Sequence, residues 1–176
     1  APWEYVQSIG EVAQDPQDAK KLAAKPGKGA IFNGDAGRTK NLITGSEWGD
    51  VEAHIEFMVP EKSNSGVYFM RRYEIQVFDS WGVVTPKYSD CGGIYQRWSS
   101  SAQGFEGRAP LVNACRKPGE WQTYDVVFRA PRFDAAGKKT ANAAFLKVVH
   151  NGTLIHENAE LTGPTRASTY SDEKPA

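Results

Sequence analysis

The chain has 176 residues, of which 40% are hydrophobic and 24% charged, the composition of an ordinary soluble globular protein. A chain of this length fits one domain with tails and can bury a core without the help of disulfides or a structural metal. Its 21 basic and 21 acidic residues cancel, so no long-range field would draw it to nucleic acid or to an anionic membrane. No apolar run approaches the roughly 20 residues that a membrane span needs.

The first part of the chain carries weak structural signals. It opens with Ala1-Pro2-Trp3 and without an initiator methionine, as a mature protein would after signal cleavage and as a trimmed chain also would. Helical periodicity appears only over residues 16–24 and predicts one short helix there. We therefore expect residues 1–28 to form an N-terminal extension that contains this helix.

Short strands are expected along the rest of the chain. Apolar and polar side chains alternate over residues 51–59 with the period of two of a half-buried strand. Asn151-Gly152 is the strongest two-residue signal for a β-hairpin, and it joins two such stretches. The other expected strands are 67–70, 73–78, 121–130, 144–150 and 153–156, with weaker candidates at 29–33 and 40–44.

Many short strands separated by Gly, Pro, Asn and Asp predict an all-β fold, either an antiparallel β-sandwich or a jelly roll. We expect this domain to cover residues 29–165, followed by a C-terminal tail over 166–176. The histidines that flank the predicted hairpin, His150 and His156, are expected at the surface.

The expected strand 73–78 carries the most informative pattern in the chain. Alternation places Arg72, Glu74 and Gln76 on one face, and the three apolar residues between and beside them on the other. A β-bulge at positions 77 and 78 would add Asp79 to the polar face. Such a face could bind and process a sugar, or it could be an ordinary solvated surface with an ion pair of little value.

The stretch from residue 80 to 120 is long, irregular and aromatic. Long loops on a rigid sheet usually carry function or are disordered, and so many aromatic side chains argue against disorder. Trp81 and Trp98 are candidate platforms for a sugar ring. Tyr95, after two glycines, could stack on a sugar or belong to the core, and Arg116 could bind a hydroxyl or an enolate oxygen.

Two cysteines occur, Cys91 and Cys115. They could form a disulfide in an exported protein, or they could be two free buried thiols, because cysteine is among the most buried residue types. Their surroundings in the sequence do not suggest a zinc site.

Five segments in order resemble one protein family. They are N-S-G-V-Y at 64–68, R-Y-E-I-Q-V-F-D-S at 72–80, C-G-G-I-Y at 91–95, N-A-C-R-K-P-G-E-W at 113–121, and the hairpin H-N-G at 150–152 followed by E-L-T-G-P-T at 160–165. Together they resemble the 3-keto-disaccharide hydrolase family, in the concanavalin A-like lectin and glucanase superfamily. The resemblance implies a concanavalin A-like β-sandwich, periplasmic or secreted, from a bacterium that degrades carbohydrate.

The resemblance also implies action on a glycoside or oligosaccharide oxidised at C3, whose C2 proton a general base can remove. Glu74 or Asp79 is the expected base, and no cofactor is required, although these two carboxylates could share a divalent cation. The expected substrate-binding residues are Arg72, Gln76, Tyr95, Trp81, Trp98, Arg116 and His54. Retaining glucanases carry an acidic residue where Gln76 stands, which favours base catalysis over their mechanism.

Two other functions remain open on the same sandwich, because a fold alone does not select a function. One is a non-catalytic carbohydrate-binding module, and the other is a subunit of a larger assembly. Family members usually continue into a closing strand with a His-Gly pair and a Phe-Arg-Asn run, whereas this chain stops before it. We expect an unpaired sheet edge here, with the missing strand held after proteolytic processing or supplied by a second polypeptide.

Overall fold

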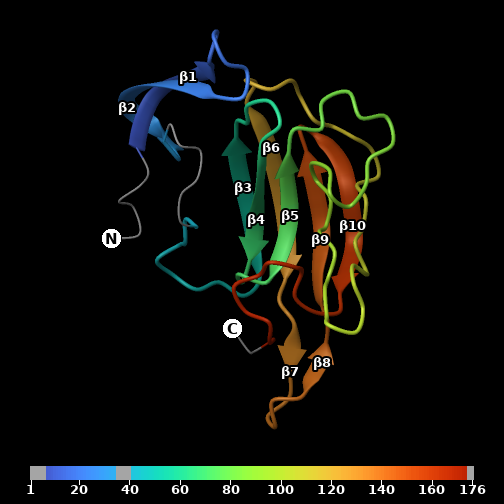
Figure 1. Cartoon of the computed structure of the whole chain (residues 1–176). Helices are drawn as coiled ribbons and strands as arrows, with labels where there is room; N and C mark the ends of the chain where they lie inside the picture. Colours follow the sequence, from blue (N-terminus) through green and yellow to red (C-terminus); the bar gives the residue numbers. More distant parts are fainter. Residues whose placement is uncertain (1–6, 35–40, 174–176) are drawn as a thin grey trace.

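The computed structural model describes residues 7–34 and 41–173, and these residues form β-strands and loops without a helix (Figure 1). No segment among them is therefore a helix that could cross a membrane. The strands are β1 (Gln7–Gln14), β2 (Leu22–Phe32), β3 (Val51–Phe57), β4 (Asn64–Phe69), β5 (Tyr73–Phe78), β6 (Gln122–Arg129), β7 (Arg132–Phe133), β8 (Lys139–Ala141), β9 (Ala143–His150) and β10 (Thr153–Leu161).

One layer of the fold is a four-stranded antiparallel sheet in the order β10-β9-β6-β3. Strand β6 shows why the sequence forms it, since Tyr124, Val126 and Phe128 are buried while the residues between them are not. Asn151 and Gly152 both have positive φ angles, of 50° and 82°, as a type I′ turn requires. The hairpin predicted at this position is confirmed.

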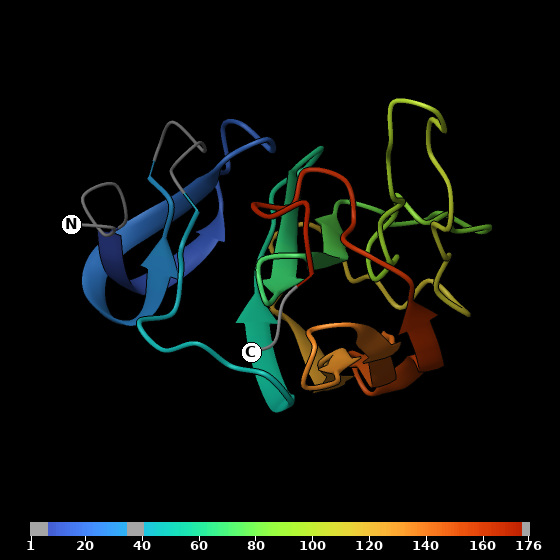
Figure 2. The same ribbon diagram turned by 90° about the horizontal axis from the view of Figure 1, so that it is seen from below.

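The second layer is the pair β4–β5, which faces the larger sheet (Figure 2). Isolated bridges widen it, from Ile75 to Ile94 and from Ile94 to Arg108. The apolar face of β5 lies in the core, as its alternation predicts, and Tyr73 packs on Phe128 of the opposite layer with ring centroids 5.5 Å apart. Burying each such side chain contributes about 1.5–3 kcal/mol. The predicted antiparallel β-sandwich is confirmed.

The short helix predicted over residues 16–24 is wrong. These residues form the turn and the first part of β2, which pairs with β1 in an antiparallel hairpin. The carboxylate of Asp15 fixes the turn by accepting hydrogen bonds from the backbone N–H groups of Gln17 and Asp18, at 2.8 and 3.3 Å. An isolated helix of nine residues would be marginal in water, whereas the hairpin pairs residues on both sides of a register shift at Ile9. Figure 2 shows this hairpin beside the sandwich.

The C-terminal segment runs back along the end of β5. The backbone N–H of Thr165 donates to the carbonyl of Arg72 at 2.8 Å, and that of Thr169 donates to the carbonyl of Arg71 at 3.0 Å. Among the described residues β4 pairs only with β5, and the missing closing strand stays a prediction. The second polypeptide expected to supply that strand stays a prediction too.

Candidate functional site

Glu74 stands at the centre of the polar face of β5. It pairs directly with Tyr68 of β4 across the antiparallel ladder, and the Tyr68 hydroxyl donates a hydrogen bond to its carboxylate. Only 6% of Glu74 is exposed. Burial raises the pKa of Glu74 to about 7, and the hydrogen bond from Tyr68 offsets part of that rise. A carboxyl group with such a pKa can accept a proton near neutral pH.

Gly66 provides the room that the Glu74 side chain occupies. It lies beside Glu74 on β4, and a Cβ at this position would overlap Oε1 of Glu74 and come within 2.9 Å of its Cδ. The glycine of the N-S-G-V-Y segment is therefore required by the close approach of the carboxyl group rather than by its own backbone angles.

Aromatic side chains lead from Glu74 towards the surface. Tyr95 donates its backbone N–H to the carbonyl of Glu74 at 3.3 Å, and its ring packs edge-on against Tyr88. The Tyr68 hydroxyl also lies 3.5 Å from the carbonyl oxygen of Arg166. The guanidinium of Arg166 stacks over the exposed ring of Trp98, 4.3 Å from its centroid. Tyr95 and Trp98, both predicted to bind substrate, thus lie on the Glu74 side of the molecule.

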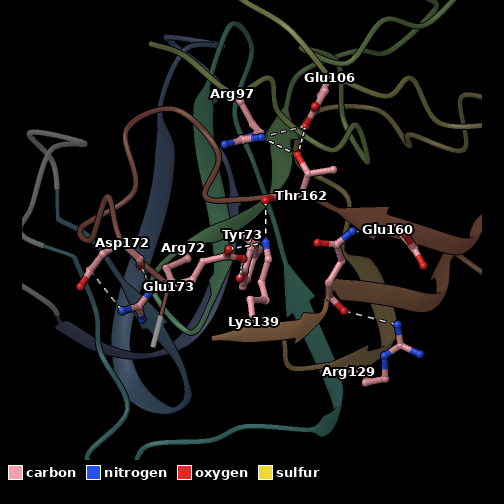
Figure 3. Close-up of polar contacts among 11 residues, drawn as sticks. Arg72, Tyr73, Arg97, Glu106, Arg129, Lys139, Glu160, Thr162, Asp172 and Glu173 are labelled. Atoms are coloured by element: carbon pink, nitrogen blue, oxygen red, sulfur yellow. Dashed lines mark hydrogen bonds and ion pairs between the residues drawn. The ribbon is translucent and has the colours of Figure 1, made fainter. Parts of the chain in front are cut away.

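A cavity of about 370 Å³ adjoins strand β5. Tyr95 and Thr165 line it, and both also bond the backbone of Glu74, the second by accepting its N–H at 3.1 Å. Arg97 forms the charged wall and pairs with Glu106 at 3.1 Å. A hydrogen bond from Thr162, together with Arg97, lowers the pKa of Glu106. Figure 3 shows Arg97, Glu106 and Thr162 held together at this wall. The volume of this cavity lies within the range of small-ligand pockets.

Another cavity, of about 390 Å³, lies over β3, β6 and β9. No residue that the sequence singles out lines it. The cavity beside Glu74 is therefore the better candidate for a substrate.

Gln76 and Arg72 share the face of Glu74, as predicted, but this face is not a solvated surface. Gln76 is 3% exposed, and its Nε2 donates to the carbonyl of Ser89 at 3.2 Å. Arg72 is 7% exposed and binds the carbonyl of Met70 at 3.0 Å and Asp172 in the C-terminal segment (Figure 3). In this arrangement both side chains hold chain segments in place, and their role in substrate binding stays a prediction.

The structure does not place Asp79 with Glu74. The β4–β5 ladder keeps one register from Phe69 and Tyr73 to Asn64 and Phe78, so the predicted bulge is wrong. Asp79 lies near Cys115 at the other end of the strand. Its carboxylate accepts the backbone N–H of Lys62 at 2.9 Å and that of Trp81 at 3.3 Å. Regular pairing up to Phe78 leaves the two acidic side chains on opposite faces of the strand, so they cannot share one cation there.

Three other predicted residues lie away from Glu74. Trp81 lies two residues after Asp79, and the ammonium group of Lys117 lies 5.6 Å from its ring centroid. Arg116 donates to the carbonyl of Trp121 at 2.9 Å. His54, also expected to bind substrate, lies on the outer face of the four-stranded sheet, 2.5 Å from Asp125. The apolar residues of β3 take the inner face, which turns His54 outwards.

The expectation that His150 and His156 are surface residues is also wrong. Both are buried, at 0% and 3% exposure. His150 lies 3.0 Å from Oε1 of Gln122, and His156 donates from Nε2 to the carbonyl of Gly92 at 2.7 Å. Burial lowers the pKa of each histidine to about 4. Each imidazole therefore stays neutral in the folded protein.

Sequence reasoning missed Tyr68 as a site residue. The signal lay in the N-S-G-V-Y segment, whose tyrosine meets Glu74 once the register of the two strands is known. In the part of the chain that the structure describes, His, Cys, Asp and Glu side chains do not gather in threes in a way that would hold a metal ion.

Residues 9–175 match the model of the 3-keto-alpha-glucoside-1,2-lyase-like domain. The chain belongs to this family. Among solved structures it is similar to a protein from Parabacteroides distasonis that is provisionally named a glycosyl hydrolase, with 28% sequence identity and a TM-score of 0.58. The similarity covers 76% of this chain and 55% of the other, so this chain spans about half the length of that protein. No protein of curated function matches the chain.

Proposed function

We propose that this 3-keto-alpha-glucoside-1,2-lyase-like domain acts on carbohydrate and cleaves the glycosidic bond of 3-keto-glycosides by base-assisted elimination. The observation that carries the proposal is the buried carboxyl group of Glu74, whose pKa is about 7, beside Tyr68. The family and the similar protein from Parabacteroides distasonis support a carbohydrate substrate. We also propose that the protein is exported and meets such sugars outside the cytoplasm.

The chemistry follows from the ketone at C3 of the sugar. The ketone acidifies the proton on C2, and ionised Glu74 accepts that proton. The electron pair of the broken C2–H bond forms an enolate with the C3 carbonyl. The C1–O bond then breaks, a C1–C2 double bond forms and the ketone is restored. The leaving oxygen takes a proton from an acid, and water can afterwards add across the double bond. Removal of a proton next to a carbonyl needs a base of this kind and a donor to the enolate oxygen.

Tyr68 is the proposed proton donor. Burial, followed by its contact with Glu74, raises the pKa of Tyr68 above its usual range, so its hydroxyl keeps its proton at neutral pH. Because it already donates to the Glu74 carboxylate, it can donate to the enolate or to the leaving oxygen when substrate enters. The proposed pocket for the leaving sugar is the cavity beside Tyr95 and Arg97, with Trp98 as an outer platform.

The test is release of aglycone from a chromogenic 3-keto-glucoside. We expect Glu74→Gln to lower kcat by about 10²–10⁴-fold, the range of general base catalysis. The wild-type rate should rise as the pH increases through about 7, because only ionised Glu74 accepts the C2 proton. Glu56→Gln is the matched control, since Glu56 is exposed on the opposite sheet and should leave the rate unchanged. Full activity of Glu74→Gln would reject the assignment.

A carbohydrate-binding module is the second candidate. The exposed ring of Trp98 favours it, because a flat aromatic ring can hold a sugar without chemistry. Saturable binding of the 3-keto-glucoside with no released aglycone, at any pH from 6 to 9, would select this function.

A further inference from the structure

Cys91 and Cys115 lie side by side in the core of the sandwich. They are 1% and 7% exposed and belong to the same buried cluster. Their thiols form a hydrogen bond with each other. The sulfur of Cys91 also lies 3.1 Å from the hydroxyl of Tyr124, and that of Cys115 lies 3.4 Å from the carbonyl of Arg116.

Hydrogen bonds to one turn hold both cysteine backbones in place. The backbone N–H of Cys91 donates to the hydroxyl of Ser80 at 2.9 Å, and that of Cys115 donates to the side chain of Asn113 at 3.0 Å. Asn113 in turn donates to the carbonyls of Ser80 and Val83 at 2.7 and 2.9 Å. The turn at Ser80 therefore brings the two thiols together without any covalent bond between them.

We propose that Cys91 and Cys115 are the site of a disulfide that closes the segment 91–115 over the candidate site. Two S–H bonds break and one S–S bond forms, and the two electrons and two protons pass to an oxidant of the disulfide class, which is reduced to two thiols. The thiolate of one cysteine attacks that oxidant, and the other cysteine resolves the mixed disulfide. The exchange takes place as this segment packs, when the two thiols have come together and an oxidant still reaches the less buried Cys115.

The geometry favours Cys115 as the first thiol to react. The hydrogen bond from Cys91 lowers the pKa of Cys115, and the same contact, together with burial, raises that of Cys91. The thiolate is the reactive form in exchange. Cys115 is also the less buried of the two, so it is the one that an oxidant can reach.

The cross-link would stiffen the wall of the cavity beside Glu74. The segment 91–115 carries Tyr95, Arg97 and Glu106, which line that cavity. Backbone hydrogen bonds already hold the first residues of the segment against β5. The N–H of Gly92 donates to the carbonyl of Gln76 at 2.9 Å, and the N–H of Gln76 donates to the carbonyl of Gly93 at 2.8 Å. A bond from Cys91 to Cys115 would tie the far end of the segment to these hydrogen-bonded residues.

The test counts free thiols and does not depend on the proposed function. The wild-type chain is refolded in a buffer of oxidised and reduced glutathione, then denatured with iodoacetamide present and weighed intact. We expect no alkyl group and a mass lower by two hydrogens, and two alkyl groups after reduction. Cys115→Ser is the control and should carry one alkyl group on Cys91. Two alkyl groups on the wild-type chain without reduction would overturn the proposal.

A second measurement asks whether the bond holds the segment. We expect a reductant to lower the midpoint of thermal unfolding of the oxidised wild-type chain and to leave that of the double variant C91S/C115S unchanged. Equal midpoints of the oxidised and reduced wild-type chain would mean that the cross-link does not constrain the fold, and this part of the proposal would fail.

Discussion

The carboxyl group of Glu74 occupies the space above the Cα of Gly66 on the neighbouring strand. The two residues are not partners in the ladder, because Glu74 pairs with Tyr68 and Gly66 pairs with Gln76. The side chain of Glu74 leans along the strand into the place where any other residue would carry its Cβ. This contact links the shape of the sheet to the chemistry of the carboxyl group, since it lets the group stay buried next to the phenol of Tyr68.

The substitution Gly66→Ala should displace Glu74. The added Cβ would overlap Oε1 and come within 2.9 Å of Cδ, so the carboxyl group must move away from Tyr68. We expect a loss of stability of about 1–3 kcal/mol, the usual cost of overpacking, measured by urea unfolding at pH 7. Turnover of a 3-keto-glucoside should fall as well. Gly45→Ala is the matched control, because nothing lies within 4 Å of a Cβ at Gly45. Equal stability of the two variants would contradict the close contact.

The raised pKa of Glu74 predicts how stability depends on pH. The unfolded chain ionises this group near pH 4.5, whereas the folded protein does so near 7. Between these values the folded state binds more protons, so stability falls as the pH rises. The shift corresponds to about 3 kcal/mol, which is fully lost above pH 7. The free energy of unfolding of Glu74→Gln, minus that of the wild type, should therefore grow by about this amount from pH 5 to pH 8. A difference that stays constant over this range would show that burial does not raise the pKa.

The layout of the strands could be predicted from the sequence wherever local chemistry decides it. Apolar and polar residues alternate in β5 from Tyr73 to Val77, and Asn151-Gly152 permits a tight turn on its own. The helix expected over 16–24 failed because a short pattern with few apolar residues fits two structures. Pairing with β1 then decided between them, and that pairing is a contact between segments that no local pattern contains.

The candidate site was harder to predict, because a strand pattern gives the face of a residue but neither its layer nor its neighbours. His54 and Glu74 both sit on well-patterned strands, yet they lie in different sheets. Tyr68 became a site residue only through the register that sets it opposite Glu74. Glu74 and Asp79 were expected on one face, and the regular ladder that parts them depends on hydrogen bonds between the two strands.

The buried histidines predict that acid destabilises the protein. The pKa of His156 falls from 6.5 to about 4 on folding, so the unfolded chain binds the proton first as the pH drops. Stability is fully present above pH 6.5 and is lost as the pH falls towards 4, by about 3 kcal/mol for this group. Urea unfolding of His156→Gln should show a flatter profile between pH 6.5 and pH 4 than the wild type.

His54 is the internal control for that experiment, because its pKa shifts in the opposite direction. Hydrogen bonds that His54 donates to Asp125 and then to Glu56 raise the pKa of His54 at the surface, so its contribution is present below pH 6.5 and is lost as the pH rises. His54→Gln should remove a small term that stabilises the protein in acid. The same change in slope for both variants would contradict the burial of His156.

Trp81 and Trp98, the two exposed tryptophans expected to bind a sugar, predict where it binds. Both rings carry a cation, Arg166 at 4.3 Å from the centroid of Trp98 and Lys117 at 5.6 Å from that of Trp81. Only Trp98 is connected to Glu74, through Arg166 and Tyr68. We therefore expect Trp98→Ala to weaken binding of a 3-keto-glucoside by about tenfold, since stacking of this kind contributes about 1 kcal/mol or more. Isothermal titration with the Glu74→Gln background would measure it without turnover.

Trp81→Ala is the matched control, because Trp81 is similarly exposed, at 53% against 43% for Trp98, but lies beside Asp79 at the other end of β5. The affinity of the Trp81→Ala variant for the sugar should equal that of the Glu74→Gln protein from which it is made. The opposite result, weaker binding for Trp81→Ala and unchanged binding for Trp98→Ala, would move the sugar site to the Asp79 end of the strand. Glu74 would then no longer be the base that meets the C2 proton.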